Sequence, residues 1–243
     1  MNTLRAADLA KRRLSLAARR LGTRDPIPLV GGFLDRSFRL PLGDPRYGNN
    51  ELTPGCFPLE HSFSEMSGRS LRFDFEPLGP DATPHARQQE TGREMRRIVS
   101  QCYGRHALQW FDERSEPWRG ARMSGQDRFG AWFGMAVDDR GLQEAKVYYE
   151  LRPRDLESLP PNLRHAANIA RSLLPGLTPV FTSIACATDR GAQRLYLFHR
   201  GELRLMDLGP LLNALGIGTK LPSLLATLGV VLGGRFVLPD GSV

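Results

Sequence analysis

Apolar and polar residues alternate with a period of two in three parts of the chain, and this period is typical of β-strands buried on one face. Each part contains a turn signal near its middle, so each predicts a β-hairpin rather than a single strand. The predicted hairpins cover residues 57–76, 127–151 and 179–200, with turns at 67–69, 138–141 and 188–191.

Between these hairpins, apolar residues recur with the period of a helix. One helix is predicted to start near Pro84, after the N-cap candidates Asp81 and Thr83, and to reach Tyr103. Two prolines at 160–161 indicate that a helix assigned to 155–174 starts properly only after them. The remaining predicted helices cover residues 106–113, 203–215 and 221–232.

The parts outside these repeats carry weaker patterns. Residues 4–21 have one apolar face and one arginine-rich face, which predicts an amphipathic helix. Three interpretations of this helix are open. It is a peripheral helix with a solvated basic face, a basic arm that binds RNA or a membrane, or a transit peptide. Residues 22–53 are rich in Gly, Pro, Asp and Asn, and we expect mostly loop there. Residues 234–242 have the pattern of the first strand and turn of a fourth hairpin without its partner, so we expect a shortened chain.

The order of paired strands and helices predicts an α+β protein. Single strands between helices would give a parallel sheet, whereas paired strands give an antiparallel sheet with helices on one face. Closing that sheet into a β-barrel would remove its edges. We therefore predict one domain over residues 1–243, an incomplete barrel of successive hairpins surrounded by helices. Its parts would be a peripheral helix at 1–21, a loop-rich stretch at 22–53 and hairpin–helix repeats at 55–243.

Composition adds limits rather than a function. Three scattered cysteines exclude a disulfide framework or a zinc site built on cysteines. No apolar run approaches the roughly eighteen residues of a membrane span, and no signal peptide is visible, so we predict a cytoplasmic protein. The net charge of +7 favours nucleic acid, anionic lipid or a phosphorylated small molecule as partner. Only three of the 33 basic side chains are lysines, which makes Lys146, in the middle of an apolar strand, conspicuous.

Cations and tyrosines alternate along two of the predicted strands. Lys146 shares a face with Tyr148, and Arg194 shares a face with Tyr196. If the apolar faces pack on helices, the cations point into the barrel, where a buried charge needs a partner. Few acids are expected on these faces, so a bound diphosphate, reached also by Arg72, is one interpretation.

Ordinary ion pairs on an outward polar face are the other interpretation, because alternation shows which residues share a face but not which face is inside. The same alternative applies to Glu60 at the start of the first hairpin, which is either a functional carboxylate or a solvated one. The ion pairs weighed are Lys146 with Glu144 or Glu150, and Glu60 with Arg72 or His61.

Three motifs resemble those of the dimethylallyltryptophan synthases, the indole prenyltransferases of the ABBA barrel type. P-L-E-H-S at 58–62 and S-L-R-F-D-F-E-P at 70–77 resemble the family's P-x-E-x-S … V-R-[FY]-x-F-E-P hairpin. K-V-Y at 146–148 matches the family's K-x-Y strand. R-L-Y at 194–196 is similar to its R-x-K-x-Y strand, with Ala192 in place of the first cation. The resemblance covers about residues 55–215.

This resemblance implies a barrel with the active site in its lumen. There an allylic diphosphate, typically dimethylallyl, ionises, and an aromatic ring attacks the allyl cation. A carboxylate takes the proton of an indole N–H or a phenol, cations neutralise the leaving group, and tyrosines shield the allyl cation. The resemblance assigns the base to Glu60 and the diphosphate site to Arg72, Lys146, Tyr148, Arg194 and Tyr196.

The implied chemistry needs neither a metal nor another cofactor, and the sequence has no D-D-x-x-D motif for magnesium. The implied partners are dimethylallyl diphosphate and an aromatic, indole-type acceptor, with neither a membrane nor nucleic acid. Family members are longer, so the barrel is completed either by missing sequence or by association, as in a homodimer. Two other functions remain open: a non-catalytic barrel that binds a phosphorylated ligand or a peptide, and an arginine-rich nucleic-acid-binding protein.

Overall fold

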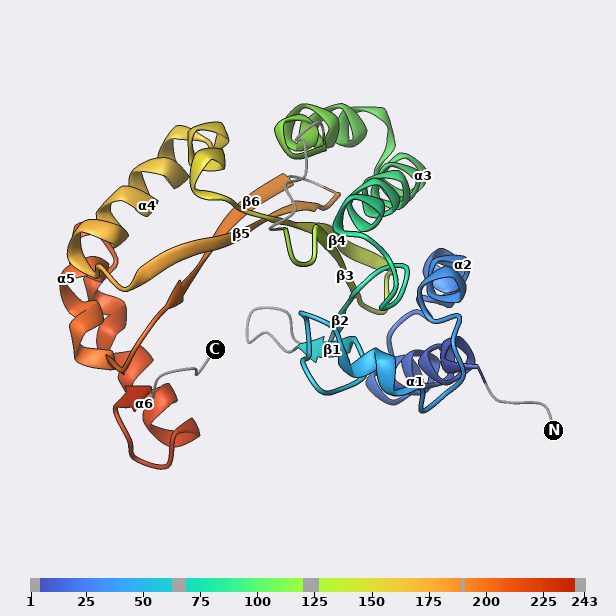
Figure 1. Cartoon of the computed structure of the whole chain (residues 1–243), viewed down its shortest axis with the longest axis horizontal. Helices are drawn as coiled ribbons and strands as arrows, with labels where there is room; N and C mark the ends of the chain where they lie inside the picture. Colours follow the sequence, from blue (N-terminus) through green and yellow to red (C-terminus); the bar gives the residue numbers. More distant parts are fainter. Residues whose placement is uncertain (1–4, 63–68, 120–126, 189–190, 239–243) are drawn as a thin grey trace. The chain divides into compact units, whose positions relative to one another are not determined.

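The fold is that of a computed structural model, which describes residues 5–62, 69–119, 127–188 and 191–238, without the side chains of 153 and 154 (Figure 1). The chain falls into two compact units. The first contains Met1–Glu150 and Ser183–Gln193, and the second contains Leu151–Thr182 and Arg194–Val243. The single domain expected from the sequence stays a prediction.

Within the described residues, six strands form one sheet in which every strand lies beside its neighbour in sequence. This confirms the α+β class and the three antiparallel hairpins. In the described chain β1 and β6 are the outer strands of the sheet, so these six strands do not close into the predicted barrel, which needs its first and last strands to pair. The strands are β1 (Leu59–Ser62), β2 (Leu71–Phe75), β3 (Ala131–Val137), β4 (Leu142–Glu150), β5 (Leu177–Cys186) and β6 (Gly191–His199).

The second hairpin turns where the sequence predicts. The Asp138 carboxylate accepts hydrogen bonds from the backbone N–H groups of Arg140 at 2.8 Å and Gly141 at 2.9 Å. Gly141 has φ +132°, a conformation that side chains with a Cβ rarely adopt. The predicted first and third turns lie largely outside the described residues, which omit 63–68 and 189–190.

The α-helices described in the first unit are α1 (Ala6–Leu21), α2 (Ile27–Ser37) and α3 (Pro84–Arg119). The N-terminal amphipathic helix is thereby confirmed, with Ala10 and Leu14 buried. Gly104, at φ 81° and ψ −170°, divides α3 into two helices. This confirms the two helices predicted after the first hairpin, although the second continues to Arg119.

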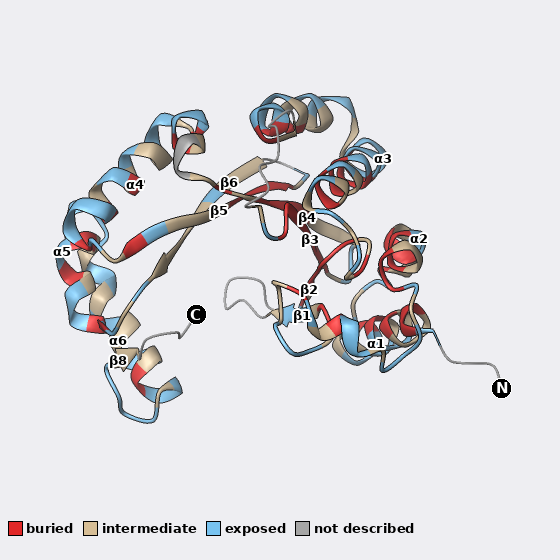
Figure 2. Cartoon of the chain, in the orientation of Figure 1, coloured by how far each residue is buried: buried red, intermediate tan, exposed pale blue. Residues whose placement is uncertain are grey.

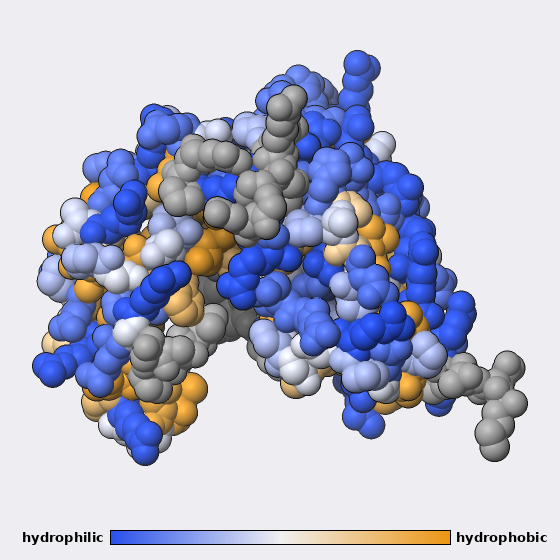
Figure 3. Space-filling view, viewed as in Figure 1, coloured by the Kyte–Doolittle hydropathy of each residue, from blue (hydrophilic) through white to orange (hydrophobic). Residues whose placement is uncertain are grey.

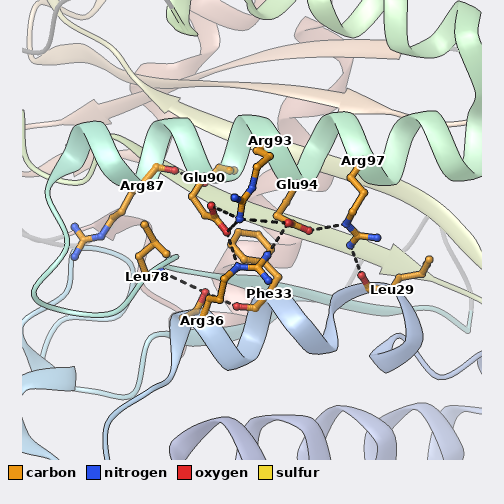
Figure 4. A network of polar contacts seen from close by, with 11 residues as sticks. Leu29, Phe33, Arg36, Leu78, Arg87, Glu90, Arg93, Glu94 and Arg97 are labelled. Carbon is orange, nitrogen blue, oxygen red and sulfur yellow. Dashed lines mark hydrogen bonds and ion pairs between the residues drawn. The ribbon is translucent and has the colours of Figure 1, made fainter.

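The prediction of mostly loop over 22–53 is wrong for α2, while Pro45–Gly48 forms a short 3₁₀ helix. Tertiary contacts override the poor helix propensity of this glycine- and proline-containing stretch. Phe33 is buried, and the Arg36 guanidinium binds Glu90 at 2.7 Å and Glu94 at 2.6 Å on α3 (Figure 4). The segment is a helix because both of its faces find partners.

The core of the first unit lies between α2, α3 and the apolar face of β2–β4 (Figure 2). The Phe33 ring lies 5.0 Å from that of Phe75 and 5.3 Å from that of Phe133, both edge-on. Met95 and Ile98 of α3 are fully buried. Each such side chain contributes roughly 1.5–3 kcal/mol by leaving water. The packing identifies which face of the sheet is apolar and leaves the other face to the polar residues.

The second unit contains the helices α4 (Pro161–Leu173), α5 (Leu208–Ala214) and α6 (Leu221–Val231). The helix α4 starts at the second proline, Pro161, with Pro160 as its N-cap residue, and a separate 3₁₀ helix occupies Pro153–Ser158. Its small core consists of Ala170, Leu174, Leu177 and Leu211.

The prediction of an unpaired strand near residue 234 is wrong. β8 (Val237–Leu238) pairs with β7 (Leu203–Arg204) in a separate two-stranded sheet. The strand predicted to lack a partner therefore has one, contributed by residues that the sequence assigned to a helix, and α5 starts only at Leu208. The turn predicted at its end lies outside the described residues. Apolar residues also reach the surface around α6, where Val230 is 84% exposed (Figure 3).

Among the described residues, no helix combines the length and the apolar character needed to span a membrane.

Candidate active site

Three polar residues and a glycine line up across four strands, on the sheet face opposite the aromatic core. The register places Glu60 of β1 opposite Asp74 of β2, Asp74 opposite Gly134 of β3, and Gly134 opposite Lys146 of β4. These residues share one face because side chains directly opposite each other in a sheet point to the same side. The register therefore joins the predicted base Glu60 and the predicted cation Lys146 in one row, with Asp74 between them.

Asp74 is the centre of this group. Lys146 Nζ lies 3.5 Å from Asp74 Oδ1, and the Tyr148 hydroxyl donates a hydrogen bond to the same oxygen at 3.0 Å. Lys146 Nζ also lies 5.0 Å from the centre of the Tyr148 ring, within the range of a cation–π contact. Asp74 and Lys146 are each only 6% exposed. Burial raises the pKa of Asp74, while Lys146 and Tyr148 act in the opposite direction.

A glycine makes room for this ion pair. A Cβ on Gly134 would lie 2.0 Å from Asp74 Oδ1 and 2.5 Å from Lys146 Cε. The two side chains therefore approach each other over a strand position that only hydrogen can occupy.

Arg72 occupies the next row on the same face. It lies opposite Ala136, which lies opposite Glu144, and its guanidinium binds Glu144 at 3.3 Å. The expectation that few acids share these faces is wrong, because Asp74 and Glu144 come from strands that the register brings beside the cations. Of the ion pairs weighed from the sequence, Lys146 pairs with neither Glu144 nor Glu150 in the contacts of the described chain, but with Asp74.

Glu60 lies at the exposed end of its row on the outer strand β1. Partial burial raises its pKa, the Asp74 carboxylate raises it further, and Lys146 lowers it. In the described residues it forms no ion pair with Arg72 or His61. His61 is the next residue along β1, so its side chain points to the opposite face. A solvent-accessible carboxylate with a raised pKa is well suited to exchange protons with a ligand.

The acid of the F-E-P motif, Glu76, is buried and supports the site from one end. Its carboxylate binds Arg87 at 2.9 Å and accepts hydrogen bonds from the Trp132 indole N–H at 3.2 Å and the Glu51 backbone N–H at 3.1 Å. The Trp132 and Tyr148 rings lie 6.3 Å apart, edge to face. Burial raises the pKa of Glu76, and the nearby Arg87 lowers it.

Sequence reasoning missed the roles of Asp74 and Glu76, although both lie on the polar face of a strand that it identified. The signal was the D-F-E spacing, which places two acids beside Arg72 on one face. Their partners on β3, β4 and α3 become visible only with the strand register.

Arg194 and Tyr196 belong to β6 and to the second unit. Arg194 is exposed, and its backbone carbonyl accepts a hydrogen bond from the Thr182 hydroxyl at 2.8 Å. The Tyr196 ring stacks on Phe181 with centroids 4.4 Å apart. The structure leaves their assignment to the diphosphate as a prediction. In the described part of the chain, no group of three or more His, Cys, Asp or Glu side chains is arranged to hold a metal ion.

Solved structures provide the comparison with known proteins, since neither a protein-family model nor a curated protein sequence matches this chain. The chain superposes on 6-dimethylallyltryptophan synthase from Micromonospora olivasterospora, solved in complex with DMASPP and Trp, with a TM-score of 0.71 at 18% identity. That match covers 98% of this chain and 75% of the other.

Two further structures agree. A 6-dimethylallyl tryptophan synthase matches with a TM-score of 0.68 at 18% identity, covering 98% of this chain and 76% of the other. The 5-dimethylallyltryptophan synthase from Streptomyces coelicolor matches with a TM-score of 0.62 at 15% identity, covering 86% and 63%. This chain therefore has the fold of the dimethylallyltryptophan synthases, the ABBA prenyltransferase fold, along almost its whole length.

Proposed function

We propose that the chain is an aromatic prenyltransferase that transfers a dimethylallyl or longer prenyl group from an allylic diphosphate to an aromatic, indole-type acceptor. The observation that carries the proposal is the row of Glu60, Asp74 and Lys146 on one sheet face, with Tyr148 bonded to Asp74. The fold adds support, because its likeness is to proteins named as 6-dimethylallyltryptophan synthases.

The proposed reaction breaks the bond between the allylic carbon and the diphosphate oxygen and forms a bond between that carbon and a ring carbon. The products are the prenylated ring, diphosphate and the proton that the ring carbon loses. Glu60 accepts the indole N–H or phenol proton as the new bond forms, and its raised pKa favours that transfer. When the ring carbon then loses its proton, Glu60 returns a proton to the nitrogen or oxygen, so that one proton is released in all. Lys146 and Arg72 neutralise the diphosphate, as cations in a low-dielectric site stabilise a leaving group strongly. No metal is required in this proposal.

Asp74 constrains how the diphosphate binds, because its carboxylate would repel an anion. Burial raises the pKa of Asp74 and so brings its neutral form closer to the physiological range. A protonated Asp74 would no longer pair with Lys146, so Lys146 could bind the diphosphate. The protonated carboxyl would itself donate a hydrogen bond to the diphosphate. Arg194 and Tyr196 are assigned to the diphosphate by the sequence resemblance alone.

The direct test is product formation from tryptophan and dimethylallyl diphosphate, with a chelator present, followed by chromatography and mass spectrometry. We expect turnover by the wild-type chain and a 10²–10⁴-fold loss in Glu60→Gln, the usual contribution of a general base. Glu157→Gln is the matched control, because its carboxylate is 82% exposed and binds only Arg164 in the described contacts.

Equal turnover in the wild type and Glu60→Gln would remove Glu60 from the mechanism. Binding of the diphosphate without turnover in either protein would instead favour the non-catalytic barrel that binds a phosphorylated ligand.

A further inference from the structure

The helix α1 contains a seven-residue sequence repeat that the proposed function does not use. L-A-K-R-R at 9–13 recurs as L-A-A-R-R at 16–20. Seven residues are almost two turns of a helix, so both copies lie on the same side of α1. The repeat therefore places Leu9 and Leu16 in one line, and two arginines follow each leucine by three and four positions.

This side of α1 faces solvent, because the other side is already packed. Leu16 is 39% exposed, whereas Leu14 is fully buried. The packed side contacts α2 and β2 in the first unit (Figure 1). Its buried residues are Ala6, Ala7, Ala10, Leu14 and Ala18. The line of Leu9 and Leu16 is thus a second apolar stripe, which the described residues leave partly uncovered.

The four arginines of the repeat are exposed: Arg12, Arg13, Arg19 and Arg20. Within the described part of the chain, their guanidinium groups form neither an ion pair nor a hydrogen bond. The acids nearby already have partners. Asp8 binds Arg5 at 3.2 Å, and Asp35 of α2 binds Lys11 at 2.6 Å. The Asp25 carboxylate accepts a hydrogen bond from the Ser15 hydroxyl at 2.8 Å. The repeat therefore presents an excess of positive charge.

A hollow of about 560 Å³ borders the apolar stripe. Its lining is mainly apolar and includes both leucines of the repeat, three of its four arginines, and Ile27, the first residue of α2. Arginine side chains can lay their methylene groups along an apolar surface and keep the guanidinium in water. The surface is an apolar hollow with cations around it.

The combination of an apolar hollow and unpaired arginines discriminates among anionic partners. The phosphates of a nucleic acid would pair with the arginines but offer no apolar group for the hollow. Membrane binding by an amphipathic helix uses its broad apolar face, and on α1 that face is buried in the protein. A second copy of α1 would bring the same four cations and be repelled. An acidic amphipathic helix offers both apolar side chains and carboxylates with a matching seven-residue period.

We propose that the side of α1 formed by the repeat, residues 9–20, docks an acidic amphipathic helix of another protein. The carboxylates of that helix pair with the arginines, and its apolar side chains enter the hollow beside Leu16. The proposal is independent of prenyl transfer and of diphosphate binding at Lys146.

Fluorescence anisotropy of a labelled peptide titrated with the full chain tests this surface. The probe copies the spacing of the repeat with opposite charge. Each of its heptads has a leucine at the first position, glutamates three and four positions later, and alanines elsewhere. We expect saturable binding that weakens as salt is added, and much weaker binding of the same peptide with glutamine in place of glutamate.

Two variants divide the surface into its charged and apolar parts. Arg12→Gln combined with Arg19→Gln should weaken binding of the glutamate peptide about tenfold, because two of the charge pairs are lost. Leu16→Gln leaves the charge unchanged and should weaken binding about fivefold, because it removes apolar surface from the hollow.

The matched control is Arg105→Gln combined with Arg114→Gln. Both arginines are exposed on α3 and form no ion pair among the described residues, so the control lowers the net charge by the same amount at a different place. Its affinity for the glutamate peptide should equal that of the wild type.

The proposal is wrong if the folded wild type does not bind the glutamate peptide saturably. Equal losses in the two double variants would also overturn it, because binding would then follow net charge alone, and an unchanged affinity in Leu16→Gln would remove the hollow from the interaction. Anionic phospholipid vesicles and oligouridylate serve as parallel arms. Tighter binding of either than of the peptide, lost with Arg12 and Arg19, would replace the protein partner by a membrane or RNA.

Discussion

Two strands carry the same cation-x-Tyr pattern in different surroundings. Lys146 and Tyr148 lie on β4, between β3 and β5, where Lys146 is 6% exposed and pairs with Asp74. Arg194 and Tyr196 lie on β6, an outer strand of the described sheet, where Arg194 is exposed. The cation-x-Tyr spacing therefore specifies that the two side chains share one face of their strand. It does not specify whether that face is buried, because burial depends on the neighbouring strands.

The difference arises from residues far away in the sequence. Lys146 pairs with Asp74 from β2, and both side chains lie over Gly134 of β3, which has no Cβ to displace them. A buried cation of this kind is held by its partner, so its removal leaves an uncompensated charge. The contacts of an exposed cation contribute little to stability, because water and salt screen its charge.

The largest expected effect is the difference in the free energy of unfolding between the variants Lys146→Met and Arg194→Met. Lys146→Met leaves Asp74 buried without its cation, and we expect it to lower the free energy of unfolding by about 3 kcal/mol. Arg194→Met should change it by about 0.5 kcal/mol or less, as surface substitutions do. Urea denaturation followed by circular dichroism measures both values. Equal losses in the two variants would show that the two motifs have equivalent environments.

Gly134→Ala should have a smaller effect and tests how the ion pair is accommodated. The added methyl group would overlap Asp74 Oδ1 and Lys146 Cε, so we expect a loss of about 1–3 kcal/mol. Gly32→Ala is the control, because its methyl group would lie 3.6 Å from the end of the Arg36 side chain, an ordinary contact in helix α2. It should stabilise the protein slightly, by about 0.5–1 kcal/mol. A tolerated Gly134→Ala would contradict the described packing of the pair.

The pH dependence of stability gives the smallest effect. Burial raises the pKa of Asp74 in the folded protein above its value of about 3.9 in the unfolded chain. Between these two values the folded state retains a proton that the unfolded state has lost, so this carboxyl makes the free energy of unfolding fall as pH rises. Asp74→Asn removes the titration.

The stability of Asp74→Asn relative to the wild type should therefore increase with pH from about 4 to the raised pKa, by at most about 1.4 kcal/mol per pH unit. Denaturation at a series of pH values measures this difference. A difference that decreases with pH would mean that Lys146 outweighs burial and lowers the pKa of Asp74.

Local patterns predicted much of the fold. Alternation along 71–75 and 145–149 identified the strands and their faces, and Asp138 with Gly141 identified a turn, because these signals act between near neighbours. The helix α2 escaped prediction because contacts of Phe33 and Arg36 with distant elements stabilise it. The pairing of β8 with β7 escaped for the same reason.

The candidate site divides in the same way. Its cations, tyrosines and Glu60 were identified from motifs. The partners of those cations, Asp74 and Glu144, depend on a register that sets β2 and β4 on either side of β3, and no local pattern specifies it. The role of Gly134, whose missing Cβ lets the Asp74 and Lys146 side chains meet, is likewise evident only once the three strands are aligned.

Diphosphate binding is the central claim, and calorimetric titration with dimethylallyl thiodiphosphate in the presence of a chelator tests it most directly. We expect saturable binding to the wild type and binding at least about tenfold weaker in Lys146→Gln, which loses a charge-assisted contact. Arg164→Gln, an exposed change in the second unit, should bind as the wild type does. Unchanged affinity in a folded Lys146→Gln, or no binding to the wild type, would contradict the assignment of Lys146 to the diphosphate.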